Sequence, residues 1–204
     1  MKTKNLGRAL IAAISLFGGF DATTSAQVTH KELFTVKGDS KGDYFGYSVS
    51  GAGDVNGDGT PDLIVGASND DNNGNDSGSV RVLSGLDGST LFTFNGDSAG
   101  DGFGSSVSGA GDVNGDGRAD LIVGASGDDN KGDDSGSARV LSGLDSSTLF
   151  TFNGDSAGDR FGSSVSGLGD LNGDGIGDFV VGGYGGTGGK GIVRVFVSST
   201  ADAP

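Results

Sequence analysis

The sequence contains no cysteine, so disulfides cannot cross-link the fold. A bound metal ion could then supply part of the stabilisation that disulfides would otherwise give. There is a single histidine, His30, so chemistry that needs an imidazole is restricted to one place in the chain. Helical periodicity is also absent, and the apolar residues fall in short runs typical of β-strands.

Basic residues are few: 13 Lys and Arg stand against 27 Asp and Glu, which gives a formal net charge of -14. A protein of this charge repels the phosphates of nucleic acids and the anionic surface of a membrane. We therefore expect no nucleic-acid partner. Glycine is abundant, with 43 residues, but hydrophobic residues still make up 33% in regular runs, which favours a folded domain.

A long hydrophobic run is missing too. The most apolar segment covers residues 9–20, follows Lys2, Lys4 and Arg8, and precedes Thr24-Ser-Ala26. A basic start, a short apolar core and small residues are typical of a secretory signal peptide. We predict that residues 1–26 are cleaved and that the mature protein is secreted, without a membrane span. A core helix at the N-terminus is the alternative.

An acidic segment is the most regular feature of the chain. It occupies residues 54–62, 112–120 and 170–178, so each copy lies 58 residues after the last. The first copy places side-chain oxygens at its positions 1, 3, 5 and 9: Asp54, Asn56, Asp58 and Asp62. The carbonyl of Thr60, at position 7, is a further donor, and two glycines give the backbone freedom to wrap around an ion. Because Ca²⁺ takes about 6–8 oxygen ligands, the segment predicts a calcium loop.

The start of this segment resembles an EF-hand loop, and position 12 provides the test. That position holds Val65, Val123 or Val181 instead of the glutamate that an EF-hand needs. A strand-like run, 63–67, also follows where an EF-hand begins its second helix. The EF-hand interpretation fails, and position 9 must complete the site. Three acidic Asp-Gly turns without metal are the remaining alternative.

Two further markers share the 58-residue period. A Phe-Gly pair precedes each acidic segment, at 45–46, 103–104 and 161–162, and Gly-Ala-Ser follows the first two. In the first unit we expect four strands, at about 47–51, 63–67, 79–83 and 91–94, with the acidic loop between the first two. The Leu-Ile-Val run lacks polar alternation, which predicts a strand buried on both faces. A single Phe at a fixed place in each unit indicates packing between units.

Phe-Gly, then D-x-N-G-D-G-x-x-D, then Gly-Ala-Ser resembles the FG-GAP repeat of integrin α-subunit propellers, over nearly all of residues 33–199. The resemblance implies an all-β fold of four-stranded β-propeller blades, with about three Ca²⁺ ions in the loops between first and second strands. The resemblance implies five ligands in each loop: Asp54, Asn56, Asp58, Thr60 and Asp62; Asp112, Asn114, Asp116, Arg118 and Asp120; and Asp170, Asn172, Asp174, Ile176 and Asp178. Thr60, Arg118 and Ile176 would bind through their backbone carbonyls. The third unit departs from the pattern, with Gly182-Gly-Tyr184 and a short Gly-rich link.

The predicted units cover about 38–95, 96–153 and 154–199, and residues 200–204 form a tail. The third unit ends after its third strand, whereas Leu33-Phe-Thr-Val36 matches the fourth strands of the other units. We expect this N-terminal strand to complete the last blade, which protects a sheet edge. Three blades are fewer than the usual 4–8 of a propeller. Either two chains share a six-bladed ring by exchanging N-terminal strands, or the chain is an open wedge or a piece of a longer product.

Two catalytic motifs match by spacing alone. G-x-S-x-G occurs at 38–42, 96–100 and 154–158, but without the strand-to-helix turn and positioned histidine of a hydrolase. We expect Asp39, Asp97 and Asp155 in these segments to form turns through bonds to the backbone. G-x-G-x-x-G at 183–188 has no helix after it, so we expect no dinucleotide site.

These features together predict a secreted, calcium-binding FG-GAP propeller module without enzymatic activity. It would act as a binding or adhesion surface for an extracellular protein or glycan. An accessory domain or fragment of a larger secreted hydrolase or phospholipase is one alternative, since the resemblance includes such propellers. A parallel β-roll with calcium turns is another, although its nonapeptide period is absent.

Overall fold

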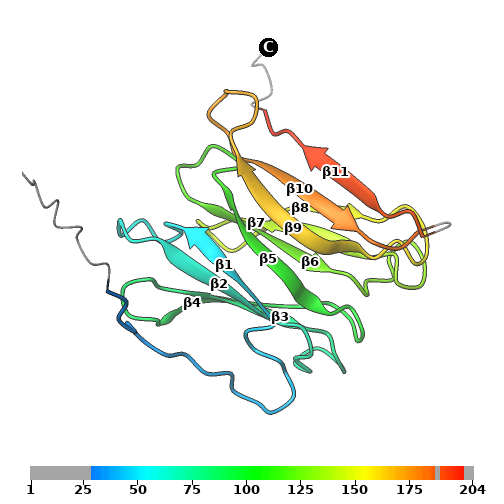
Figure 1. Ribbon diagram of the computed structural model, residues 1–204, viewed down its shortest axis with the longest axis horizontal. Helices are drawn as coiled ribbons and strands as arrows, with labels where there is room; N and C mark the ends of the chain where they lie inside the picture. Colours follow the sequence, from blue (N-terminus) through cyan, green and yellow to red (C-terminus); the bar gives the residue numbers. More distant parts are fainter. Residues whose placement is uncertain (1–28, 187–188, 200–204) are drawn as a thin grey trace, which may run out of the picture. The chain divides into compact units, whose positions relative to one another are not determined.

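A computed structural model describes residues 29–186 and 189–199 (Figure 1). The chain divides into two compact units, residues 1–32 and residues 33–204, and the strands of the described residues all belong to the second. The predicted signal peptide, residues 1–26, and the predicted tail, residues 200–204, lie outside the described residues.

The second unit consists of three antiparallel sheets in chain order. The first sheet contains β1 (Ser48–Gly53), β2 (Asp62–Ala67), β3 (Ser79–Leu83) and β4 (Thr90–Asn95). The second contains β5 (Phe103–Gly111), β6 (Asp120–Ala125), β7 (Ser137–Leu141) and β8 (Thr148–Asn153). The third contains β9 (Phe161–Gly169), β10 (Asp178–Gly183) and β11 (Ile192–Phe196). Consecutive strands pair in each sheet, as in the blade of a propeller, and the four strands predicted for the first unit are confirmed.

The second strand of each sheet carries the apolar run that the sequence showed. All six residues of β6 are buried, because the second sheet has a neighbouring sheet on both faces. Leu121 and Val123 belong to the core shared with the first sheet, whereas Ile122 belongs to the core shared with the third. The prediction of a strand buried on both faces is thus confirmed.

Two hydrophobic cores hold the sheets together. We call the face that a sheet turns toward the next sheet its forward face, and the opposite one its rear face. Each core joins one forward face to the rear face of the following sheet. The forward-face residues of the first two sheets are Ala52, Val55, Ile64, Val80 and Val82, and then Ala110, Val113, Ile122, Ala138 and Val140. All ten are buried, so packing between sheets supplies most of the apolar burial in the described residues.

Glycine lets neighbouring sheets approach closely at one strand position. A Cβ added to Gly66 in β2 would lie 2.0 Å from the carbonyl oxygen of Gly104, and one added to Gly124 in β6 would lie 1.8 Å from that of Gly162. Contacts this short are impossible for a side chain, so glycine is required where the two backbones meet. The following sheet therefore dictates these glycines of the Gly-Ala-Ser marker.

The N-terminal segment differs from the prediction. Residues 33–36 form no strand, and the third sheet has three strands in the described part of the chain. The segment instead lies against the first sheet, where the Phe34 ring borders Gly88 and the Lys37 carbonyl accepts a hydrogen bond from Arg81. The third sheet packs on the second and not on the first, so a segment held at the first sheet does not complete it within this chain.

No helix in residues 29–186 or 189–199 is long and apolar enough to cross a membrane.

Candidate functional site

The three acidic segments form loops at one end of the sheets, between β1 and β2, β5 and β6, and β9 and β10. Gly57 and Gly59 have φ values of 77° and 86°, and their counterparts in the other loops are also left-handed. This conformation favours glycine, which explains the N-G-D-G centre of each loop. Each backbone curls tightly around the first carboxylate of its loop.

The same hydrogen bonds recur in all three loops. In the first, Asp54 Oδ1 accepts the N–H groups of Gly57 and Asp58 at 2.6 and 3.1 Å, and its Oδ2 accepts the Gly59 N–H at 2.9 Å. Asn56 Oδ1 also accepts the Asp58 N–H, and Asp58 Oδ1 accepts the Thr60 N–H. Because Asp54 and Asn56 share one N–H donor, their oxygens lie close together. The side-chain donors at positions 1, 3 and 5 are therefore brought to one place.

Position 9 has a different setting. Asp62, Asp120 and Asp178 are almost completely buried beneath their loops. Asp120 Oδ2 accepts the Val113 N–H at 2.8 Å, and its Oδ1 accepts the Gly143 N–H at 3.0 Å, in the turn between β7 and β8. Each of the other two likewise bridges its acidic loop to a distant backbone N–H. Position 9 thus ties two loops together, and its part in metal binding stays a prediction.

The loop carboxylates differ in their tendency to ionise. Hydrogen bonds from the Asn56 side chain and the Thr60 N–H lower the pKa of Asp58, and backbone hydrogen bonds, first from Gly175, lower the pKa of Asp170. Burial raises the pKa of Asp120, against the hydrogen bonds from Gly143 and Val113. Asp58 and Asp170, which lie on the rims of their loops, are therefore better suited than the buried Asp120 to hold a negative charge at neutral pH.

The donor set of each loop fits a hard cation. Two carboxylates and an amide oxygen lie on the exposed rim, and oxygen is the ligand that Ca²⁺ prefers. Within the part of the chain that the structure describes, no three acidic or histidine side chains form a cluster arranged to hold a metal ion. The rim carboxylates point instead at the N–H groups of their own loop. Their oxygens keep lone pairs, so a shared cation is compatible with this arrangement.

Position 7 of the second and third loops contacts the loop before it. The Arg118 guanidinium lies directly over Gly57 of the first loop, and the Ile176 side chain lies 3.4 Å from a Cβ built on Gly115 of the second. The backbone follows the same pattern, since the Gly177 N–H donates to the Asp112 carbonyl at 2.7 Å. The first loop therefore has a positive charge beside it that the second does not receive from the residue at this position.

A contact between distant residues was missed from the sequence. Arg139 in β7 forms two hydrogen bonds with Asp97, at 2.9 and 2.5 Å, and lies 5.1 Å from the centre of the Phe103 ring. The corresponding groups in the other units are Arg81, Asp39 and Phe45, and Arg194, Asp155 and Phe161. The feature of the sequence that could have revealed this contact is an arginine at the same place in each third strand. Phe103 and Phe161 are fully buried between sheets, which confirms their predicted packing role.

Two predictions about the G-x-S-x-G segments have different outcomes. The proposal that Asp39, Asp97 and Asp155 form turns is wrong, because these carboxylates pair with arginine. The turn bonds come instead from residues four further on, where Asp101 accepts the Ser98 N–H. The segments at 96–100 and 154–158 lie in connections between sheets, and the segment at 38–42 precedes the first sheet; none has a following helix in the described residues. This arrangement lacks the strand-to-helix elbow of a serine hydrolase.

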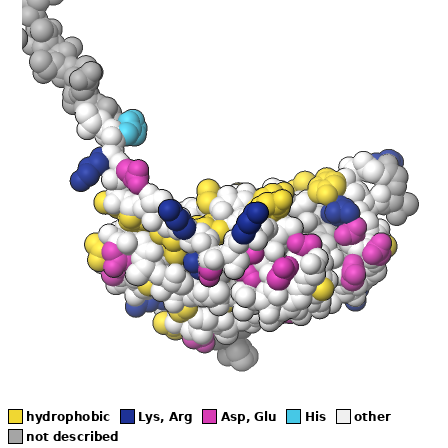
Figure 2. All heavy atoms as spheres, turned by 90° about the horizontal axis from the view of Figure 1, so that it is seen from below, with side chains coloured by type: hydrophobic (Ala, Val, Ile, Leu, Met, Phe, Trp, Pro, Cys, Tyr) yellow, Lys and Arg dark blue, Asp and Glu magenta, His cyan; other side chains and the backbone are white. Residues whose placement is uncertain are grey.

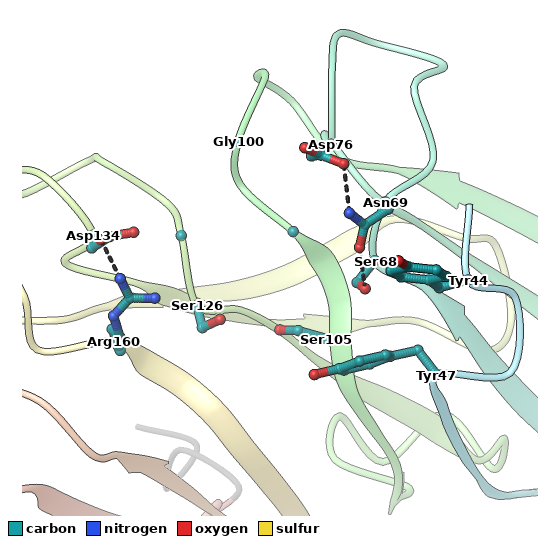
Figure 3. A pocket seen from close by; sticks show the side chains of 12 residues that line it. Tyr44, Tyr47, Ser68, Asn69, Asp76, Gly100, Ser105, Ser126, Asp134 and Arg160 are labelled. Carbon is teal, nitrogen blue, oxygen red and sulfur yellow. Dashed lines mark hydrogen bonds and ion pairs between the residues drawn. The ribbon is translucent and has the colours of Figure 1, made fainter. Parts of the chain in front are cut away.

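The opposite end of the sheets carries a polar pocket of about 370 Å³ (Figure 3). Tyr44 and Tyr47 enter it from the first unit and are both largely exposed. Arg160, from the third unit, is paired with Asp134 at 2.5 Å, and Asn69 donates to Asp76 at 2.6 Å. The remaining lining residues, Ser68, Gly100, Gly102, Ser105, Ser126 and Gly127, come from the first two units. Adjacent units therefore build one surface of aromatic, hydroxyl and charged groups.

Comparison with known proteins identifies the repeat. The profile of the FG-GAP repeat matches residues 45–83 and 103–141, which run from the Phe-Gly pair to the end of the third strand. Integrin alpha-5 of Xenopus laevis is 37% identical over 163 residues, and integrin alpha-V of Gallus gallus is 34% identical over 161. Integrin alpha-PS2 of Drosophila melanogaster is 34% identical over 168 residues.

These similarities cover about three quarters of this chain, at 75%, 75% and 76%. They cover only 15%, 15% and 12% of the integrin subunits. The chain thus resembles a small part of each relative.

Proposed function

This chain is built of FG-GAP repeats similar to those of integrin α subunits, and from that premise we propose that it is an extracellular, calcium-binding propeller module that serves as a binding surface. The observation that carries the calcium part is the identity of the three loops. Each repeats the same donor residues and the same hydrogen bonds, so the side-chain oxygens at positions 1, 3 and 5 are brought together on the rim in all three loops.

The rim side chains at positions 1, 3 and 5 would hold the ion in each loop, with the carbonyl at position 7 as a further ligand. These side chains are Asp54, Asn56 and Asp58; Asp112, Asn114 and Asp116; and Asp170, Asn172 and Asp174. Bound calcium would supply positive charge that offsets the repulsion between neighbouring carboxylates. The buried aspartate at position 9 keeps the loop seated on the sheet and is the fourth predicted side-chain ligand.

We expect removal of calcium to lower the melting temperature. An ion present at about 100 times its dissociation constant stabilises the fold by about 2.7 kcal/mol, which for a chain of this size corresponds to roughly 5–10 °C per site. Thermal unfolding in millimolar calcium and after chelation gives the difference. An unchanged melting temperature would refute calcium as part of the fold.

Titration calorimetry on variants assigns the ions to loops. Asp116→Ala removes a rim carboxylate of the second loop and should reduce the number of ions bound from about three to two. Asp71→Ala is the matched control, since Asp71 is also an exposed aspartate but accepts the Asp76 N–H at the other end of the first sheet. Loss of an ion in the control, or none in Asp116→Ala, contradicts the assignment.

The binding surface that we propose is the pocket at the opposite end from the acidic loops. Exposed tyrosine and arginine are enriched among residues that dominate binding energy, and the pocket contains both. Its hydroxyl and carboxylate groups suit an extracellular protein or glycan with hydrogen-bond donors. We assign no catalytic step to this surface.

A binding experiment tests this surface directly. We expect the protein to be retained on some members of a panel of immobilised extracellular-matrix proteins and glycans, and Tyr47→Ala to reduce that retention at least tenfold. Leu144→Ala is the control, because Leu144 is similarly exposed in the turn at the acidic-loop end. Equal retention of both variants, or retention of neither variant nor wild type, argues against the pocket.

A further inference from the structure

The two outer faces of the row of sheets carry the same apolar positions as the faces that are packed inside it. Val193 and Val195 on the forward face of the third sheet are 71% and 53% exposed. The residues at the same positions in the first sheet, Val80 and Val82, are 0% exposed because the second sheet covers them. Leu168 and Leu171 are likewise exposed where the other sheets have buried Ala and Val. The third sheet thus has a stacking face without a partner in the described residues.

The rear face of the first sheet shows the same contrast. Val49 is 65% exposed, whereas Val107, at the same position in the second sheet, is 6% exposed under the first. Figure 2 shows exposed apolar side chains in several patches among the charged groups of one face. One end of the row therefore offers a forward face and the other a rear face, and these are the two surfaces that already fit each other twice within the chain.

Glycines give independent evidence for this interpretation. Gly182 occupies the position of Gly66 and Gly124, which press against the next sheet, yet a Cβ on Gly182 would meet nothing closer than 3.7 Å. Gly51 occupies the position of Gly109 and Gly167, where a Cβ would lie 2.8 and 2.3 Å from a carbonyl of the preceding sheet, and a Cβ on Gly51 would meet nothing. Neither Gly51 nor Gly182 has a left-handed φ. No contact among residues 29–186 and 189–199 requires glycine at either position, whereas a covering sheet would.

The N-terminal segment already lies where an additional blade would place it. In the third sheet, Arg194 contacts the connection that precedes this sheet: it donates a hydrogen bond to the Asn153 carbonyl and forms an ion pair with Asp155. In the first sheet, Arg81 donates to the Lys37 carbonyl and pairs with Asp39 in the same way. Asn153 is the last residue of the fourth strand of the second sheet, and Asp155 follows two residues later. Residues 33–36 therefore sit at the start of the first sheet as the fourth strand of a preceding sheet would.

In the described part of the chain, the third sheet has no fourth strand. Figure 1 shows β11 at the edge of its sheet, and an apolar cavity of about 290 Å³ beside it is lined by Phe150, Phe152, Phe179 and Phe196. Leu33 and Phe34 would bring apolar side chains to this edge. In the first sheet, Val80 of the third strand pairs with Phe94 of the fourth. The same register would pair Val193 with Val36, since these residues hold the corresponding positions.

We propose that a second copy of this chain covers both outer faces, so that two chains close a six-bladed ring. The forward face of each third sheet packs on the rear face of the partner chain's first sheet, and each segment 33–36 adds the fourth strand to β11 of the other chain. Two such interfaces arise from one two-fold axis, which closes the assembly at six blades, within the usual 4–8. The ring does not depend on calcium binding, so the two proposals fail separately.

Light scattering of the purified protein in millimolar calcium tests the ring first. We expect twice the mass of one chain, and a single-chain mass at micromolar concentration overturns the proposal whatever its calcium content. Gly51→Leu and Gly182→Leu should each give the single-chain mass with unchanged far-ultraviolet circular dichroism, because both interfaces of the ring contain one Gly51 and one Gly182, so either leucine blocks both. Thr151→Leu is the control, since Thr151 is exposed on the outer strand of the second sheet, away from both end faces. This variant should keep the mass of two chains.

A cross-link tests the exchanged strand. The chain has no cysteine, so Val36→Cys combined with Val193→Cys introduces the only two thiols. Mild oxidation, which removes two electrons and two protons for each disulfide, should give a covalent dimer on a non-reducing gel. The single variants should each give little dimer. A disulfide within one chain, or none in the double variant, contradicts the exchange.

Discussion

Asp120→Ala is expected to lower the free energy of unfolding by about 4 kcal/mol, because two buried N–H groups lose their acceptor and each unsatisfied donor costs about 1–3 kcal/mol. Asp120 is 0% exposed and holds the Val113 and Gly143 N–H groups on its two oxygens. Among the described residues, Asp120 is the side-chain acceptor of both donors, so water would have to enter a buried site to replace it. Chemical denaturation after calcium chelation gives the value without a contribution from bound metal.

Asp116→Ala is the matched control for that experiment. Asp116 lies in the same loop and also accepts an N–H, from Arg118, but on the exposed rim, where water can replace it. We expect its effect without calcium to be below about 1 kcal/mol. In the presence of calcium, Asp116→Ala should cost more stability than it does in chelator, since Asp116 then contributes a ligand to the ion. If Asp120→Ala is as mild as Asp116→Ala in chelator, the buried aspartate does not tie the two loops together.

Gly124→Ala should also be strongly destabilising, with an expected loss of about 3 kcal/mol or more in the free energy of unfolding. The new Cβ would lie 1.8 Å from the Gly162 carbonyl oxygen and 2.6 Å from the Ser106 hydroxyl. The carbonyl belongs to the backbone of β9, so relief requires the second and third sheets to move apart, which would also open the core containing Ile122 and Val181.

Gly182→Ala provides the comparison, since Gly182 holds the same position in the third sheet without a sheet in front of it. In dilute solution, where single chains are compared, we expect a change of less than about 1 kcal/mol, because the added methyl group restricts the unfolded chain and meets only ordinary contacts. Equal losses in the two variants would show that the strand itself, and not the neighbouring sheet, requires glycine.

Much of the fold was accessible from the sequence because its signals are local and repeat three times. The strand at 63–67 follows from an apolar run of the right length, and the acidic loops follow from glycines at positions with left-handed φ. The 58-residue period then extends each conclusion to the other units. The burial of Phe103 was predictable for the same reason, since one aromatic residue recurs at one place.

The rest depends on directions and distances that residue types do not encode. Position 9 looked like any other carboxylate donor, and only the fold shows that Asp120 points into the protein while Asp116 points out. The pair of Arg139 and Asp97 joins residues 42 positions apart, so no local pattern announces it. The place of residues 33–36 within the single chain was missed because their sequence matches a fourth strand. The contacts of Arg81 with Lys37 and Asp39, which follow the segment, hold this part of the chain beside the first sheet.

The arrangement of forward and rear faces has a consequence for how such a protein can change length. Every unit presents one face of each kind, and the connection between units keeps the same Asp-to-Arg contact. Duplicating or deleting one 58-residue unit in a gene would therefore recreate contacts that already exist, without a new core having to arise by point mutation. Lineages that carry this repeat can vary the number of blades by recombination alone, and selection would act mainly on whether the resulting row closes.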